Sequence, residues 1–142
     1  MESFDKHIKI LESKCEEWGI TLKKNARSYY FDHDEREIGI PLHTKNKKSI
    51  ICGLLHEMGH AIQDNHPFEE IYKSPVVNRF IIISLEYEAW KIGLDILEET
   101  GLAEYRKYYI KAWVKSWNKY IDYTADYPAD ALKFLSRSIS PR

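Results

Sequence analysis

The stretch from residue 50 to residue 62 combines two periodic features that constrain the fold. Its apolar residues recur three and four positions apart, as on one face of an α-helix: Ile50, Ile51, Leu54, Leu55, Met58 and Ile62. His56 and His60 stand four positions apart in the same stretch, so a helix places their imidazoles one turn above each other. Asn46 or Ser49 is the expected N-cap, and the helix should end near Asp64.

The five residues from His56 to His60 match the pattern H-E-x-x-H, which is typical of a metal site on a helix. Two imidazoles on one face can bind one ion, and zinc is the expected ion because it prefers tetrahedral sites with nitrogen and oxygen ligands. Glu57, between the histidines, can reach a water on the metal and is the expected general base. Cys52, one turn before His56, is interpreted as a core residue rather than a ligand.

A third zinc ligand is needed, and two glutamates on the next predicted helix are candidates. Glu86 and Glu88 fall within residues 76–99, where apolar side chains occupy nearly every helix face and predict a central, mostly buried helix. A carboxylate is costly in such a place unless it is paired or binds a metal. Only one of the two is required as a ligand.

His66 is an alternative third ligand. Together with the two motif histidines it has the spacing of H-E-x-x-H-x-x-G-x-x-H. That longer motif needs a glycine after the second histidine to turn the chain, and this sequence has Gln63 there. No methionine follows Met58, so the Met-turn that accompanies the longer motif is also missing.

Length and composition predict one α+β domain over residues 1–142. With 142 residues, 44% hydrophobic and 13% aromatic, the chain can bury a core without disulfides or a structural metal, and disorder is excluded. The 21 basic and 22 acidic residues give a formal net charge of −1, which argues against a surface built wholly for nucleic acid. Two cysteines 37 positions apart predict no disulfide scaffold.

The remaining elements are predicted from periodicity and from turn residues. An N-terminal helix should span residues 2–18 and end at Gly19. A small three-stranded antiparallel sheet is expected next, followed by the H-E-x-x-H helix. The long helix should begin after Ser74-Pro75 and end at Gly101, before two C-terminal helices. The predicted strands cover residues 20–22, 29–31 and 38–40, and the C-terminal helices cover residues 102–121 and a short stretch after Pro128.

These motifs resemble those of gluzincin zinc metallopeptidases, in particular the small phage and bacterial ImmA/IrrE-type peptidases. The likeness covers residues 38 to about 97 and rests on the H-E-x-x-H motif followed by Glu86-Tyr87-Glu88-Ala89, an E-x-x-A motif on the next helix. It implies that His56 and His60 bind Zn²⁺ with Glu86 as third ligand, and that the enzyme cleaves a peptide or protein substrate. Trp90 stands where the family pattern has Asp or Asn, so another residue must orient a ligand histidine.

The resemblance also implies how a substrate would bind. In such enzymes an extended peptide pairs with an edge strand just before the active-site helix, and residues 36–41 are placed to be that strand. An oxyanion donor is also expected. His66, Tyr87 and Tyr127 are the candidates.

The predicted helix 102–121 has a basic face, on which a lysine recurs every fourth residue: Lys107, Lys111, Lys115 and Lys119. The opposite stripe is apolar, and the simpler interpretation is a solvated face over a packed one: Ile110, Trp113, Val114, Trp117 and Ile121. The alternative is a zinc-containing protein- or DNA-binding module resembling SprT-type DNA-linked proteases, in which this helix contacts nucleic acid. Lys45, Lys47 and Lys48 would extend that surface.

The sequence predicts a cytoplasmic protein of a bacterium or a phage-infected cell. The N-terminus lacks a basic region followed by an apolar run, so no secretory signal is expected. The longest apolar stretch, near residues 80–85, is far shorter than the roughly 20 residues of a membrane span, so no membrane association is expected.

Overall fold

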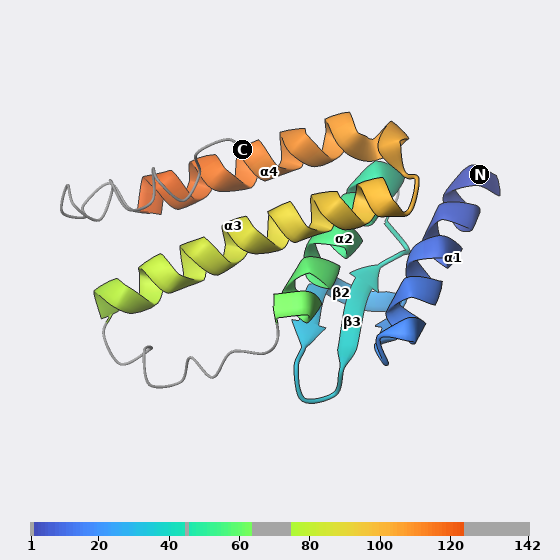
Figure 1. Ribbon diagram of the computed structural model, residues 1–142, viewed down its shortest axis with the longest axis horizontal. Coiled ribbons are helices and arrows are strands. Elements are labelled where there is room, and N and C mark those ends of the chain that lie inside the picture. Colours follow the sequence, from blue (N-terminus) through green and yellow to red (C-terminus); the bar gives the residue numbers. More distant parts are fainter. Residues whose placement is uncertain (1, 45, 64–74, 124–142) are drawn as a thin grey trace.

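The computed structural model describes residues 2–44, 46–63 and 75–123 and has the predicted α+β class (Figure 1). The predictions made for Lys45, His66, Ser74, Tyr127 and the helix after Pro128 concern residues outside these ranges. The elements in chain order are α1 (Glu2–Glu17), β1 (Thr21–Lys23), β2 (Asn25–Asp32), β3 (Glu37–Pro41), α2 (Lys47–Gln63), α3 (Pro75–Glu99), the 3₁₀ helix η2 (Ala103–Tyr105) and α4 (Arg106–Tyr123).

The three strands form a mixed sheet in the order β1-β3-β2, so the prediction of an all-antiparallel sheet was wrong. β2 and β3 form the expected antiparallel pair, but β1 runs parallel to β3. Only Lys24 separates β1 from β2, and a tight hairpin needs at least two loop residues. β1 therefore lies on the opposite side of β3 from β2.

This order makes β3 the central strand of the sheet. The expectation that residues 36–41 offer a free edge to a substrate is contradicted, because both sides of β3 are already paired: Thr21 aligns with Glu37, and Tyr30 aligns with Gly39. Within the described part of the chain, the sheet edges belong to β1 and β2.

The helix boundaries follow the signals in the sequence. Gly19 and Gly101 have φ angles of 71° and 73°, a left-handed conformation that glycine adopts at helix C-termini without strain. Asn46 is the N-cap of α2, since its side-chain oxygen accepts a hydrogen bond from the Ser49 amide at 3.1 Å.

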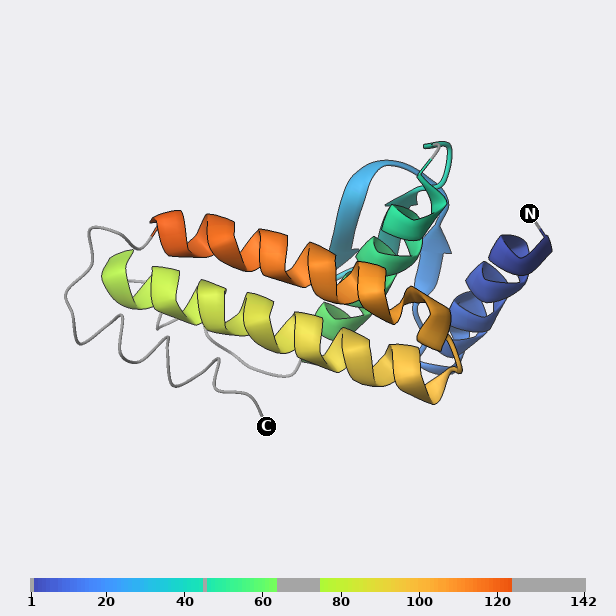
Figure 2. The same ribbon diagram turned by 90° about the horizontal axis from the view of Figure 1, so that it is seen from above.

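Helix α2 lies between the sheet and α3 (Figures 1 and 2). Its apolar stripe is fully buried, as predicted, at Ile50, Ile51, Leu54, Leu55 and Met58. Ile62 departs from the prediction and is 42% exposed. The buried stripe fixes the rotation of α2 about its axis and so determines where its two histidines point.

Helix α3 packs against α2 along one face and beside α4 along another (Figure 2). The prediction that it is mostly buried holds only in part for the side chains from residue 82 onward, because one face is buried while Ile82, Glu88 and Asp95 are exposed. Buried residues there recur at helical spacing on the face toward α2: Ile83, Ala89, Trp90, Gly93, Ile96 and Leu97. The helix therefore buries one face in this region, although its apolar residues are distributed around it.

Helix α4 covers the α2–α3 pair mainly through Tyr109, which is fully buried and donates a hydrogen bond to the backbone oxygen of Trp90. The lysine face at positions 107, 111, 115 and 119 is exposed, as expected. The predicted apolar stripe is only half-buried at Ile110, Trp113 and Trp117, and Val114 is 54% exposed. No helix in the described ranges is both long enough and apolar enough to cross a membrane.

Candidate metal centre

Three side chains from α2 and α3 converge on one point: His56, His60 and Glu86. The Nε2 atoms of the two histidines are 3.2 Å apart. The carboxylate of Glu86 lies 2.8 Å from Nε2 of His56 and 3.2 Å from Nε2 of His60. These are the three residues that the sequence motifs predict as metal ligands.

The spacing of the three groups suits a tetrahedral zinc site. Ligand atoms about 2.0–2.1 Å from zinc in tetrahedral geometry lie about 3.3 Å from one another. The observed separations of 2.8–3.2 Å are close to this value. The three side chains are between 13% and 23% exposed, so a fourth position remains accessible to water or to a substrate.

Glu86 and Glu88, the two candidate glutamates, occupy different faces of α3. Glu86 lies three positions after Ile83 and four before Trp90, on the stripe that packs against α2, whereas Glu88 is exposed. The geometry therefore brings Glu86 to the histidines. The rival ligand His66 lies outside the described residues.

The protonation behaviour of the three groups reflects their mutual contact. Burial lowers the pKa of His56 below 6.5, although Glu86 opposes this shift. Burial acts in the same direction on His60, but the hydrogen bond and charge of Glu86, assisted by Glu57 and Gln63, raise its pKa overall. Burial would raise the pKa of Glu86, yet its hydrogen bonds to the two histidines hold it well below the usual range. The site thus contains an ionised carboxylate.

Glu57 is buried beside this cluster, with only 9% of its surface exposed. Burial raises the pKa of its carboxyl to about 7, and the negative charge of Glu86 adds to the rise while His60 opposes it. Glu57 borders the same cavity as His56. Its carboxyl therefore lies beside the candidate metal ligands, with a pKa in the range where it can exchange a proton near neutral pH.

Gln63 orients His60. The side-chain oxygen of Gln63 lies 2.9 Å from Nδ1 of His60, and its amide nitrogen donates to the backbone oxygen of Leu85 at 2.8 Å. Nδ1–H must be the donor in the first contact, which leaves Nε2 with a lone pair for a metal. In the sequence, Gln63 stands out only because it replaces the glycine of the motif H-E-x-x-H-x-x-G-x-x-H. Its position three residues after His60 on the same helix face is the signal that could have revealed this role.

Trp90 orients His56 by packing rather than by a hydrogen bond. The indole is stacked on the imidazole with ring centroids 4.2 Å apart and an angle of 29° between the planes. Within the described ranges, neither Nδ1 of His56 nor Nε1 of Trp90 has a hydrogen-bond partner. The aromatic face thus fixes the orientation of the His56 ring.

A close helix crossing brings Glu86 within reach of α2. A Cβ at Gly59 would lie 2.1 Å from the backbone oxygen of Ala89, and one at Gly93 would lie 2.7 Å from the backbone oxygen of Leu55. Both glycines allow contact between the backbones of the two helices. The two contacts, Gly59 with Ala89 and Leu55 with Gly93, are one helical turn apart on each helix, so α2 and α3 stay close next to His56, His60 and Glu86.

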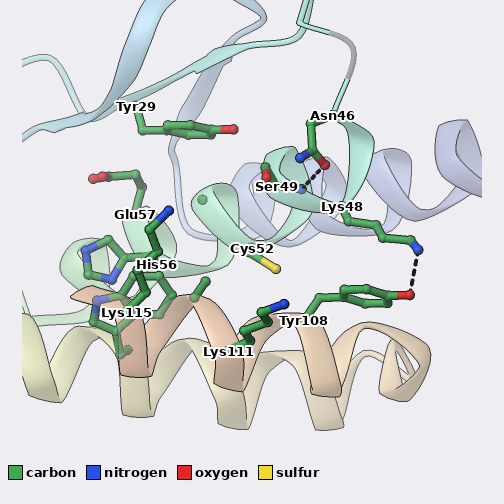
Figure 3. A pocket seen from close by; sticks show the side chains of 13 residues that line it. Tyr29, Asn46, Lys48, Ser49, Cys52, His56, Glu57, Tyr108, Lys111 and Lys115 are labelled. Carbon is green, nitrogen blue, oxygen red and sulfur yellow. Dashed lines mark hydrogen bonds between the residues drawn. The ribbon is translucent and has the colours of Figure 1, made fainter. Parts of the chain in front are cut away.

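A cavity of about 530 Å³ opens from the cluster along α2 (Figure 3). His56 and Glu57 lie at one end of it, and Asn46 and Lys48 lie at the other. Tyr29 of β2 forms one wall, and its ring meets α2 at Gly53, where a Cβ would approach it to 2.3 Å. Sequence reasoning did not identify Tyr29 as part of the site.

Of the three predicted oxyanion donors, the described residues include Tyr87, and its ring does not lie at the cluster. Tyr87 packs between α3 and α4, with its ring 5.2 Å from that of Trp113 and 5.9 Å from that of Trp117. It does not line the cavity at His56. His66 and Tyr127 lie outside the described residues.

Comparison with protein-family profiles, with curated proteins and with solved structures finds no match to this chain.

Proposed function

We propose that this chain is a zinc-dependent metallopeptidase of the gluzincin type. The observation that carries the proposal is the convergence of His56, His60 and Glu86, with the buried carboxylate of Glu57 beside them at the end of an open cavity. Two imidazoles and one carboxylate form a donor set that zinc prefers in catalytic sites. The resemblance to ImmA/IrrE-type peptidases supports the same assignment.

Each residue has a role that follows from its position. Zinc, when bound, supplies a Lewis acid that polarises a carbonyl oxygen and makes water acidic enough to react near neutral pH. Glu57 accepts a proton from the attacking water and returns it to the leaving amine. Gln63 and Trp90 hold the two imidazoles in the orientation that directs Nε2 of each toward the ion.

The small size of the protein favours cleavage of a specific substrate over general proteolysis. The cavity is short, and in the described part of the chain it is bordered by β2, by α2 and its cap Asn46, by α4 and, through Trp90, by α3. Such a site should accept a short segment of one specific partner protein, folded or extended, in preference to arbitrary unfolded chains. Extensive digestion of unfolded casein would contradict this part of the proposal.

The experiment that tests the proposal compares the parent protein with Glu57→Gln. The substitution keeps the shape of the side chain but removes the proton acceptor, so zinc content and fold should be retained while peptide cleavage falls by at least about 100-fold. Cleavage is measured by mass spectrometry on a diverse peptide mixture, and zinc by elemental analysis. His60→Ala is the matched control, since it should lose both zinc and cleavage.

A zinc-containing binding module is the second candidate function. It is favoured by the exposed lysine face of α4, two of whose members, Lys111 and Lys115, reach the cavity. This candidate predicts that Glu57→Gln leaves the biological activity unchanged. Equal cleavage by the parent protein and the variant, or none by either, would reject the peptidase.

A further inference from the structure

The cavity beside the metal centre has a strongly basic lining. Three lysines face it, Lys48 from the start of α2 and both Lys111 and Lys115 from α4, whereas Glu57 is its single carboxylate among the described residues. The first turn of α2 contains no acidic residue, so the positive end of its dipole adds to this charge.

The lysines are available to a ligand. Lys111 and Lys115 are exposed, and neither forms an ion pair with another described residue. Lys48 donates a hydrogen bond to the hydroxyl of Tyr108 at 2.6 Å and lies 3.9 Å from the centre of its ring. The Tyr108 hydroxyl can therefore direct its own proton toward an acceptor in the cavity.

The basic groups are arranged along the cavity rather than at one point. In Figure 3 Lys115 lies at the His56 end, Tyr108 and Lys48 lie at the far end, and Lys111 lies between them. Lys48 and His56 are about 12 Å apart along α2, at 1.5 Å per residue. An extended peptide covers that distance with about four residues.

We propose that the substrate of this site is an acidic peptide segment, with at least one Asp or Glu side chain within about four residues of the cleaved bond, held by Lys48, Lys111 and Lys115. The distance between the acidic side chain and the cleaved bond rests on the proposed peptidase function. The binding of an acidic segment itself depends only on the cavity. Carboxylate groups spaced along an extended chain match the row of ammonium groups along the cavity.

The test measures binding separately from cleavage. A fluorescent peptide rich in Ala and Glu and its analogue with Gln for Glu are titrated with zinc-loaded Glu57→Gln protein, followed by fluorescence polarisation. The acidic peptide should bind at least about tenfold more tightly than the neutral one, and the difference should shrink as salt is added.

Matched double variants assign the effect to the cavity. Lys111→Glu combined with Lys115→Glu should remove the preference for the acidic peptide. Lys107→Glu combined with Lys119→Glu changes the net charge equally on exposed positions away from the cavity and should retain it. Circular dichroism and zinc content check that each variant folds.

The outcomes distinguish this inference from the proposed function. Equal binding of the two peptides, or an equal effect of the two double variants, overturns the acidic-substrate inference even if the protein cleaves peptides. Tighter binding of a single-stranded oligonucleotide than of the acidic peptide also overturns it. A preference for the acidic peptide that depends on Lys111 and Lys115, in a protein without any cleavage, supports the acidic site and rejects the peptidase.

Discussion

Gln63 holds Nδ1 of His60 at 2.9 Å while donating to the backbone of Leu85 at 2.8 Å, so one side chain ties a metal ligand to the neighbouring helix. Both contacts lie in a part of the protein that is nearly closed to solvent, since Gln63 is only 9% exposed. The amide therefore couples the orientation of the His60 ring to the packing of α2 against α3.

Gln63→Ala should weaken zinc binding by about 10- to 100-fold, because it removes the acceptor that orients the His60 ring. Gln63→Glu keeps the acceptor for His60 but loses the donor to Leu85, so its zinc affinity should fall less than that of the Ala variant. Competition with a chelating dye measures both affinities. Equal affinities for the Ala variant and the parent protein would show that the hydrogen bond has no part in metal binding.

Trp90→Ala should lower the free energy of unfolding of the metal-free protein by about 3–5 kcal/mol, because it empties a buried site against His56 and Tyr109. Trp90→Phe should cost clearly less, since a ring is kept and no hydrogen bond of Nε1 to a described residue is lost. Urea unfolding followed by circular dichroism measures the difference. Similar losses for the two variants would contradict a packing role.

Gly59→Ala should destabilise the protein and reduce its zinc affinity. In an ordinary helix this change stabilises by about 1 kcal/mol, but here the new Cβ would lie 2.1 Å from the Ala89 backbone oxygen. The helices must separate, which moves Glu86 away from the histidines. Ile62→Ala, on the exposed side of α2, is the control and should leave zinc affinity unchanged. An increase in both properties for Gly59→Ala would contradict the close crossing.

Alkaline pH should destabilise the protein as the partly buried Tyr29 and the hydrogen-bonded Tyr30 ionise. Burial raises the pKa of Tyr29 to about 12, and the hydrogen bond from Tyr30 to Glu37 raises that of Tyr30 to about 12. The folded state holds these protons more tightly than the unfolded chain. Its added stability is complete below a pH of about 10 and is lost as the pH rises toward 12.

Ultraviolet absorbance of the phenolate, recorded against pH, checks this prediction. Some of the 10 tyrosines should titrate late, together with the loss of helical circular dichroism. Tyr30→Phe should remove one late-titrating group. Titration of every phenol near pH 10 with the fold intact would contradict the packing of Tyr29 and the contact of Tyr30.

Much of the fold could be predicted because its signals are local. The buried stripe of α2, the Asn46 cap and the left-handed Gly19 and Gly101 each depend on residues within a few positions of one another. The same local spacing places His56 and His60 on one face. The class, the order of the helices and most of their boundaries were predictable for this reason.

The sheet order and the burial of α3 and α4 were not predictable, since they depend on contacts between distant segments. The parallel pairing of β1 with β3 follows from the path of the chain around β3, which strand propensity does not encode. Apolar residues around α3 indicated burial on all sides, but α2 and α4 cover only part of its surface. Val114 is exposed for the same reason.

The convergence of His56, His60 and Glu86 was predictable, but the surroundings of these side chains were not. Glu86 could be favoured from the E-x-x-A motif, yet its separation from Glu88 depends on which face of α3 meets α2. The stacking of Trp90 on His56 and the approach of Tyr29 join different elements. No periodicity within a single element reports such contacts.

Anomalous diffraction at the zinc absorption edge, from crystals of the zinc-loaded protein, tests the central claim most directly. The account predicts one strong peak about 2.0–2.2 Å from Nε2 of His56, Nε2 of His60 and a carboxylate oxygen of Glu86. Absence of a peak at this point, or a peak bound by His66 or Glu88 in place of Glu86, would contradict the account.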